Sequence, residues 1–251
     1  AASTYREYGV EYPHPGWVEQ SVSRLWDAQC AVTRQLIANA GCSAKEIAAA
    51  AVSSQRATFV PLDENRCPIG PFIGWQDTRS TRQCDWAREN IGERQYYDIA
   101  GLPISPTAAV TKILWIKEND PDLFDRTATF ATTQCVHLEQ LGVKNAPSDL
   151  ADGGYTGLMD VDALSWSREL LAAFGIPQEK MPKLVNSGVQ VGEVSAEAAE
   201  QCGLFPGTPV VTAGGDLQCA GAGLGIVRPG TISVGIGSGG GILIYLVNPL
   251  R

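Results

Sequence analysis

The stretch that decides the fold is Pro209-Val210-Val211-Thr212-Ala213-Gly214-Gly215-Asp216. Its apolar part, residues 210–213, predicts a short buried strand that ends in two glycines and a carboxylate. Open α/β sheets bind their ligands at the carboxyl ends of the strands, and glycine lets another segment or a substrate approach the backbone closely. Asp216 is therefore a candidate catalytic carboxylate. The alternative is that Asp216 only caps a helix that begins at Leu217.

Outward from this stretch, short apolar runs alternate with segments of helical periodicity. Buried strands are predicted at residues 48–53 and 58–62. A helix is predicted over residues 22–37, with Ser21 as its N-cap and Gly41 as its end. Further helices are predicted at residues 78–90, 108–119, 134–141 and 162–174. The alternation indicates an α/β fold in which helices cover sheets with much parallel pairing.

The composition excludes several classes of protein. The chain has 251 residues, of which 44% are hydrophobic, and 27 acidic against 19 basic side chains give a net charge of -8. Such a chain is too apolar to be disordered and too mixed to span a membrane. The acidic balance argues against a nucleic-acid partner. Only His14 and His137 are present, which excludes a histidine-rich metal centre.

The cysteines indicate a reducing compartment. Seven are spread along the chain and none forms a Cys-x-x-Cys pair, which predicts free thiols in a cytoplasmic protein and no disulfide frame. The apolar tail at residues 231–247 is interrupted by glycines, so we expect strands there and no membrane helix.

A second cluster of polar residues follows two apolar runs. Gln55 and Arg56 come after the strand predicted at 48–53, and Trp75, Asp77 and Arg79 follow the next apolar run. Amide, guanidinium and carboxylate groups together suit a ligand with several hydroxyls, because each can bond an OH group. The alternatives are a solvated turn for the first pair and a helix start capped by Asp77 for the second group.

A third segment, residues 230–241, is rich in glycine and lies between two predicted strands. Such a turn can present backbone N–H groups to a phosphate. It lacks the lysine and the following helix of a P-loop, so a plain hairpin is the better interpretation from local sequence. In the helix predicted at 108–119, the spacing favours core packing, with Lys117 facing water, and we expect His137 to be structural.

Together these segments resemble the FGGY family of carbohydrate kinases, and the resemblance covers nearly the whole chain. The matching stretches, in order, are residues 14–20, Ser54-Gln55-Arg56, Trp75-Gln76-Asp77-Thr78-Arg79, residues 112–119, Thr156-Gly157-Leu158-Met159-Asp160 and Gly214-Gly215-Asp216. The resemblance implies an actin-like ATPase (ribonuclease H-like) fold in which ATP, with Mg²⁺, and a sugar or polyol meet between two domains. It also implies that Asp216 is the general base that accepts the proton of the sugar hydroxyl.

The resemblance assigns the remaining site residues by matching position. The predicted substrate-binding residues are Gln55, Arg56, Trp75, Asp77, Arg79 and Thr107. The predicted nucleotide-binding residues are Gly235, Ile236 and Gly237, with Ile236 in place of the family's usual threonine. The residues that bind the metal are not predicted.

The family pattern also predicts how the chain is divided. Residues 1–225 correspond to the N-terminal sugar-binding domain without its first hairpin, and residues 226–251 open the C-terminal ATP-binding domain, so the kinase fold is incomplete at both ends. We therefore expect residues 1–251 alone to phosphorylate no sugar.

The substrate stays open. Glycerol kinases carry a glutamate at the position of Ala57, and xylulokinases carry Met-His where this chain has Arg56-Ala57, so neither glycerol nor xylulose is favoured. A ketose, a polyol or a linear sugar is compatible, as is a homo-oligomer. The alternative function is a carbohydrate-binding or regulatory module without catalysis. An acyl-transfer enzyme is remote, because no Gly-x-Ser-x-Gly elbow lies in a strand-turn-helix context.

Overall fold

The computed structural model describes residues 2–236 and 240–247, and two sheets form its centre. One sheet has the order β1-β4-β3-β5, with β1 at Glu19–Gln20, β3 at Phe59–Leu62, β4 at Phe72–Ile73 and β5 at Thr129–Thr132. The other has the order β10-β11-β2, with β2 at Ala50–Ser54, β10 at Gln190–Glu193 and β11 at Pro209–Gly215. The predicted strands at 48–53, 58–62 and 210–213 are thus confirmed to within two residues at each end.

Three two-stranded sheets complete the described strands. They are β6 (Ser148–Asp149) with β9 (Leu184–Val185), β7 (Met159–Asp160) with β8 (Ser165–Trp166), and β12 (Ile232–Ile236) with β13 (Gly240–Ile244). Among the described pairings only β11–β2 and β6–β9 are parallel, so the prediction of much parallel pairing is wrong. Short connections such as the one between β7 and β8 allow only antiparallel pairing, and the alternation of elements does not reveal them.

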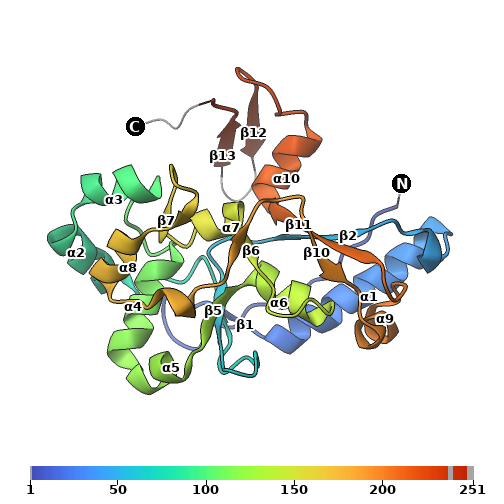
Figure 1. Ribbon diagram of the computed structural model, residues 1–251, viewed down its shortest axis with the longest axis horizontal. Helices are drawn as coiled ribbons and strands as arrows, with labels where there is room; N and C mark the ends of the chain where they lie inside the picture. Colours follow the sequence, from blue (N-terminus) through green and yellow to red (C-terminus); the bar gives the residue numbers. More distant parts are fainter. Residues whose placement is uncertain (1, 237–239, 248–251) are drawn as a thin grey trace.

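The helices cover these sheets (Figure 1). They are α1 (Val22–Ala40), α2 (Thr81–Asn90), α3 (Glu93–Ala100), α4 (Ala109–Asn119), α5 (Pro121–Arg126), α6 (Thr133–Gln140), α7 (Leu150–Gly154), α8 (Arg168–Phe174), α9 (Ala196–Cys202) and α10 (Asp216–Gly223). Short 3₁₀ helices occupy Ala44–Glu46 and Gln178–Lys180. None of the helices in the described residues is long and apolar enough to cross a membrane.

Helix α1 shows how local sequence sets the element ends. The hydroxyl of Ser21 accepts a hydrogen bond from the backbone N–H of Arg24, and Gly41 ends the helix in the left-handed region at φ 63°. By contrast, the helix predicted over 162–174 is wrong in its first half. There β7 and β8 form a hairpin, and α8 begins only at Arg168, after its N-cap Ser167.

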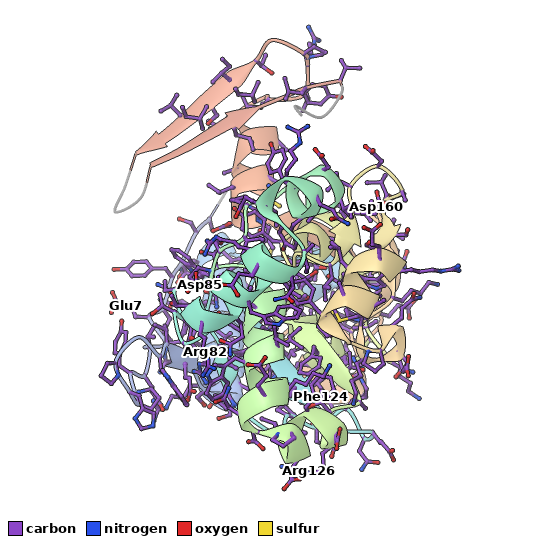
Figure 2. The ribbon with its side chains drawn as sticks, turned by 90° about the vertical axis from the view of Figure 1, so that its left-hand side faces the viewer. Glu7, Arg82, Asp85, Phe124, Arg126 and Asp160 are labelled. Atoms are coloured by element: carbon purple, nitrogen blue, oxygen red, sulfur yellow. The ribbon has the colours of Figure 1, made fainter. Side chains whose placement is uncertain are left out.

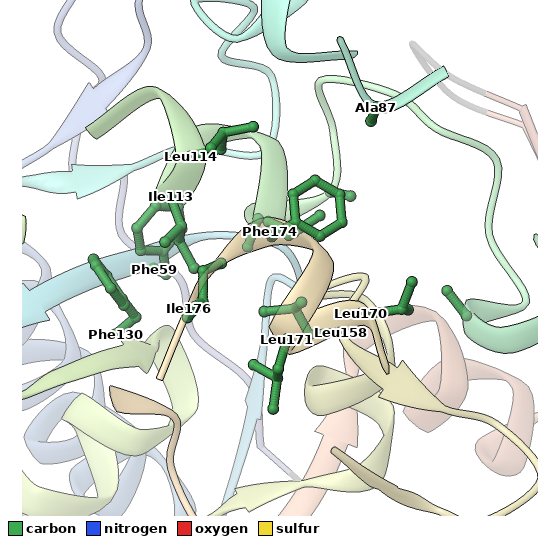
Figure 3. Packing of buried hydrophobic residues seen from close by; sticks show 14 of the residues in the cluster. Phe59, Ala87, Ile113, Leu114, Phe130, Leu158, Leu170, Leu171, Phe174 and Ile176 are labelled. Atoms are coloured by element: carbon green, nitrogen blue, oxygen red, sulfur yellow. The ribbon is translucent and has the colours of Figure 1, made fainter. Parts of the chain in front are cut away.

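The largest apolar core surrounds α4 (Figure 3). Ile113 packs with Phe59 of β3, Phe130 of β5 and Phe174 of α8, so the prediction that this helix packs in the core is confirmed. The prediction that Lys117 faces water is corrected, because its ammonium binds two backbone carbonyls. It donates to the carbonyls of Phe174 and Gly175, at 3.2 and 2.8 Å, which α8 leaves unsatisfied at its C-terminus.

The β12–β13 hairpin and α10 project from the rest of the chain (Figures 1 and 2). The two strands pair antiparallel, as the hairpin interpretation predicted. Their apolar side chains are exposed, with Val234 at 62% and Ile242 at 70%.

Candidate functional site

The site lies where the parallel strands β2 and β11 end. Gly215 of β11 is in register with Ser54 of β2, so the residues that follow the two strands emerge at the same edge. A bulge between Thr212 and Gly214 shifts the register, and Gly214 adopts φ 107°, a conformation that favours glycine. The pairing of β2 with β11 brings Asp216 close to Gln55 and Arg56.

Gly215 makes room for Arg56. A Cβ at Gly215 would lie 2.5 Å from Cδ of Arg56, which no real side chain tolerates. The guanidinium of Arg56 then stacks on the ring of Tyr155, 4.0 Å from its centroid. The close approach predicted for the paired glycines is therefore made by a side chain of this protein. No N–H group of Arg56 donates a hydrogen bond to another of the described residues.

Arg56 and Tyr155 line a cavity of about 380 Å³. Its lining consists of Gln55, Arg56, Trp75, Thr107, Tyr155, Asp216 and Leu217. Asp216 is exposed and is the first residue of α10, while Gly215 occupies the N-cap position, so the interpretation of Asp216 as the N-cap is wrong. One carboxylate oxygen of Asp216 accepts from the N–H of Leu217 at 2.8 Å, which fixes the group at the cavity mouth.

A second cavity, of about 660 Å³, adjoins the first. The two share Gln55, Trp75 and Asp216. His137 lies on the wall of the second cavity, where burial lowers the pKa of the imidazole to about 4. Its Nδ1 lies 3.1 Å from Oε1 of Gln140 on the same helix, which fits the structural role predicted for it.

Trp75 and Thr107 both line the 380 Å³ cavity, and each is held by a hydrogen bond to its backbone. The N–H of Trp75 donates to the hydroxyl of Thr58 at 3.1 Å, while its side chain is 44% exposed. The carbonyl of Thr107 accepts from the ammonium of Lys112 at 2.9 Å. Gln55 is held by its side-chain amide, which donates to Oε1 of Gln20 at 2.5 Å. Four of the six predicted substrate-binding residues therefore line one cavity.

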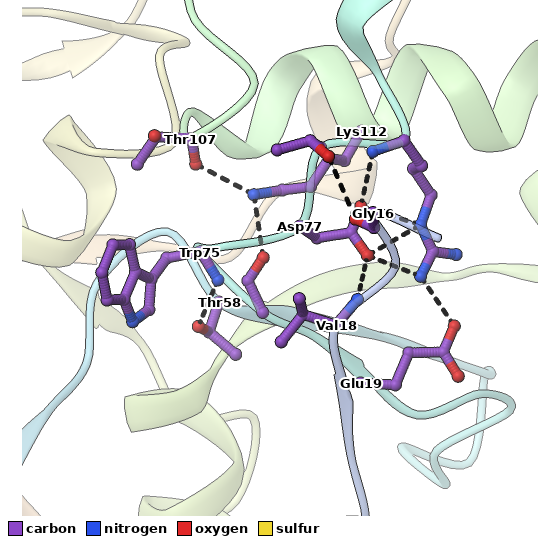
Figure 4. Close-up of polar contacts among 11 residues, drawn as sticks. Gly16, Val18, Glu19, Thr58, Trp75, Asp77, Thr107 and Lys112 are labelled. Carbon is purple, nitrogen blue, oxygen red and sulfur yellow. Dashed lines mark hydrogen bonds and ion pairs between the residues drawn. The ribbon is translucent and has the colours of Figure 1, made fainter. Parts of the chain in front are cut away.

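Asp77 and Arg79 have a different environment (Figure 4). Asp77 is fully buried and accepts from the backbone N–H of Val18 at 2.7 Å and from Arg79 at 2.8 Å. Arg79 also pairs with Glu19 at 2.7 Å and stacks 3.7 Å from the ring centroid of Trp17. Neither residue lines the cavity, and their predicted role in binding the sugar stays a prediction. Their charges satisfy one another, so they brace the loop that carries Trp75.

Two buried aspartates form the floor behind β2 and β11. Asp152 accepts from the hydroxyl of Ser54 at 2.8 Å, and its own N–H donates to Asp149 at 2.8 Å. Burial, and then the nearby Asp149, raises the pKa of Asp152 to about 7, while Arg56 acts against that rise. Asp149 also accepts from the hydroxyl of Ser187 at 3.1 Å. These bonds therefore tie β2 to α7, and α7 to β6.

The predicted nucleotide residues lie in the projecting hairpin. Gly235 is paired with Gly241, and Ile236 with Gly240, in the β12–β13 ladder. Gly237 lies outside the described residues. A Cβ on Gly235 would have its nearest neighbour at 3.8 Å, so this glycine gives no sign of a tight phosphate cradle. The nucleotide role of these three residues stays a prediction.

Two lining residues, Tyr155 and Leu217, were not predicted. Tyr155 directly precedes the matching stretch that begins at Thr156, and Leu217 directly follows Asp216, so adjacency to these stretches was the signal available.

Solved structures with this fold define the class of the chain. The crystal structure of xylulose kinase from Rhodospirillum rubrum superposes with a TM-score of 0.89 at 26% identity, covering 94% of this chain and 48% of that one. The crystal structure of Plasmodium falciparum glycerol kinase with ADP gives a TM-score of 0.86 at 21% identity and shows the same fold. The chain therefore has the actin-like ATPase fold of sugar kinases.

The sequence comparisons make the family definite. The family model for the N-terminal domain of the FGGY family of carbohydrate kinases matches residues 1–223. An autoinducer-2 kinase of Salmonella choleraesuis is 31% identical over 223 residues, which are 88% of this chain and 42% of the relative. A glycerol kinase of Methylibium petroleiphilum is 33% identical over 225 residues, 87% of this chain and 44% of the relative. The chain belongs to the FGGY family of carbohydrate kinases and spans less than half the length of these curated relatives.

Proposed function

We propose that the protein containing this chain transfers a phosphoryl group from ATP to a hydroxyl of a sugar or polyol, with Asp216 as the general base. The observation that carries the proposal is the exposed carboxylate of Asp216 at the mouth of a cavity whose other polar walls are neutral or cationic. Family membership supports the reaction class.

The chemistry assigned to Asp216 follows from its position. An alcohol is a poor nucleophile, and a carboxylate that accepts its proton as the new O–P bond forms assists the attack. Asp216 stands at the first position of α10, directly after Gly215 at the N-cap position. The start of this helix holds the proton acceptor in place through the N–H of Leu217, which donates to one carboxylate oxygen.

Arg56 supports the choice of a hydroxyl-bearing substrate. Its guanidinium is oriented by Tyr155, and its donors are unused by the other described residues. Hydroxyl oxygens accept such donors, and the amide of Gln55 and the hydroxyl of Thr107 can both donate to and accept from an OH group. The indole of Trp75 offers an apolar wall to the carbon skeleton.

ATP supplies the phosphoryl group in this proposal, and Gly235, Ile236 and Gly237 remain the residues proposed to meet it. Among residues 2–236 and 240–247 no group of three or more His, Cys, Asp or Glu side chains is arranged to hold a metal ion. We therefore assign no step to Mg²⁺, and the proposed steps involve only Asp216 and the residues that line the cavity.

The test is the full-length protein and its Asp216→Asn variant, assayed for ADP release over a panel of polyols, ketoses and linear sugars. Loss of the general base should lower kcat by about 10²–10⁴-fold and leave sugar binding intact. Asp122→Asn is the matched control, because Asp122 is an exposed aspartate in the first turn of α5 and should have no effect on turnover.

Two outcomes would contradict the proposal. Unchanged turnover in Asp216→Asn would remove this carboxylate from the mechanism. Sugar binding without ADP release by the wild-type protein would favour the alternative, a carbohydrate-binding or regulatory module.

A further inference from the structure

Lys112 is fully buried, and it does not line the 380 Å³ cavity. It extends from α4, and its ammonium donates to the carbonyl of Gly74 at 3.2 Å and to the carbonyl of Thr107 at 2.9 Å (Figure 4). Lys112 is not needed for the proton transfer assigned to Asp216, so its burial requires another explanation.

The two carbonyls belong to two different segments, each of which contributes to the lining of the cavity. Gly74 directly precedes Trp75, and Thr107 contributes its own side chain to the lining. The two loops are separated by more than thirty residues of sequence, including α2 and α3. Lys112 therefore joins two segments that the intervening chain connects only indirectly.

A buried ammonium is an expensive way to fill space. Burial lowers the pKa of Lys112 to about 7, and Arg79 adds to that effect while Asp77 opposes it. A methionine of similar length would pack in the same volume without desolvating a charge, and such replacements are often neutral or stabilising. A lysine at this position is explained if its hydrogen bonds hold the walls in place.

We propose that Lys112 is a positioning residue of the sugar site, which sets the separation of Trp75 and Thr107 by binding the carbonyls of Gly74 and Thr107. The inference rests on the proposed function and adds a residue that acts on the sugar through two others. The inference predicts a larger effect on the affinity for the sugar than on the nucleotide or the chemical step, because Lys112 binds the two carbonyls and not Asp216.

The experiment compares Lys112→Met with Lys117→Met in the full-length protein. Lys117 is the matched control, because it lies on the same helix and also donates to two backbone carbonyls, but these belong to the end of α8, away from the cavity. We measure kcat, the KM for the sugar, the KM for ATP and the free energy of unfolding for both variants.

Lys112→Met should raise the KM for the sugar by about tenfold or more, with kcat and the KM for ATP changed less than threefold, as expected for misplaced binding groups. Lys117→Met should leave the KM for the sugar at the wild-type value. Lys112→Gln, which keeps two N–H donors on a shorter chain, should give an intermediate KM and serves as the test if Lys112→Met does not fold.

An unchanged sugar KM in folded Lys112→Met or Lys112→Gln would overturn the inference while the kinase proposal stands. An equal rise in Lys117→Met would also overturn it, since the effect would then belong to α4 as a whole. A wild-type protein that phosphorylates no sugar would instead remove the proposed function, and this inference with it.

Discussion

Trp75 and Asp77 are two residues apart, yet they belong to regions of opposite character. The indole of Trp75 is 44% exposed on the cavity wall, whereas Asp77 is fully buried under it and satisfies Arg79 and the N–H of Val18. One short motif thus supplies both a part of the cavity wall, Trp75, and the buried frame that holds it, Asp77 with Arg79. The difference teaches that a stretch shared with a family of enzymes need not act on the substrate at every position.

The largest effect on the free energy of unfolding should follow from removing the buried carboxylate of Asp77. Asp77→Ala leaves Arg79 and the N–H of Val18 without their main partner in a site that excludes water. Removal of one member of a buried ion pair destabilises a protein by about 3–5 kcal/mol. Chemical unfolding of the full-length variant should show a loss of this size.

The matched control is Asp85→Ala. Asp85 pairs with Arg88 at 2.9 Å, but its side chain is 64% exposed, so the loss should stay below about 1 kcal/mol. Equal losses in the two variants would mean that Asp77 contributes no more than a surface charge, and the distinction between wall and frame would fail.

A smaller effect on the free energy of unfolding should follow from removing the side chain of Trp75 from the cavity wall. Trp75→Ala removes a half-exposed side chain that packs little in the core, so the free energy of unfolding should change by about 1 kcal/mol or less. The KM for the sugar should rise about tenfold, because one side of the cavity is lost. Steady-state kinetics and chemical unfolding of the same preparation separate the two quantities.

Trp17→Ala sharpens this comparison, since Trp17 stacks on Arg79 and does not line the cavity. It should lower stability and leave the KM for the sugar unchanged. A Trp75→Ala variant that loses stability while keeping its KM would assign Trp75 to the frame instead.

The sequence predicted the fold where local signals suffice. The caps Ser21 and Gly41, the strand before Gly214 and the helix at 108–119 all follow from patterns within a few residues. The β7–β8 hairpin was missed, because Leu164 turns the chain with φ 50°, a conformation that apolar periodicity does not reveal. The antiparallel order β1-β4-β3-β5 depends on contacts between distant segments.

The sequence predicted which residues belong to the candidate site better than it predicted how they are arranged. Asp216, Gln55 and Arg56 meet because β11 and β2 pair in parallel, whereas the sequence predicted only that each group follows an apolar strand. The sequence did not predict which of these side chains face the cavity and which face the interior. Asp77 and Arg79 turn inward because Glu19 and Val18, from a segment sixty residues earlier, complete their hydrogen bonds. Tyr155 enters through its stacking on Arg56, a contact across about a hundred residues.

The smallest expected effect concerns pH and distinguishes Lys112 from Asp152. The pKa of Lys112 is about 7 in the folded protein against 10.5 for an ordinary lysine, so between these values the unfolded chain binds more protons and stability rises with pH. The pKa of Asp152 is about 7 against 3.8, so between those values the folded protein binds more protons and stability falls as pH rises.

Two variants isolate these opposite slopes, because all other titrating groups cancel in the comparison with wild type. From pH 7.5 to 8.5 the unfolding free energy of wild type should gain about 1 kcal/mol more than that of Lys112→Met, close to the limit for one proton. From pH 5 to 6 wild type should lose about 1 kcal/mol relative to Asp152→Asn, which still accepts from Ser54. Parallel curves in the first interval would mean that Lys112 stays charged in the fold, held by Asp77 strongly enough to outweigh its burial. The ammonium would then belong to the ion cluster of Asp77 and Arg79, and the frame would extend directly to the carbonyl of Thr107.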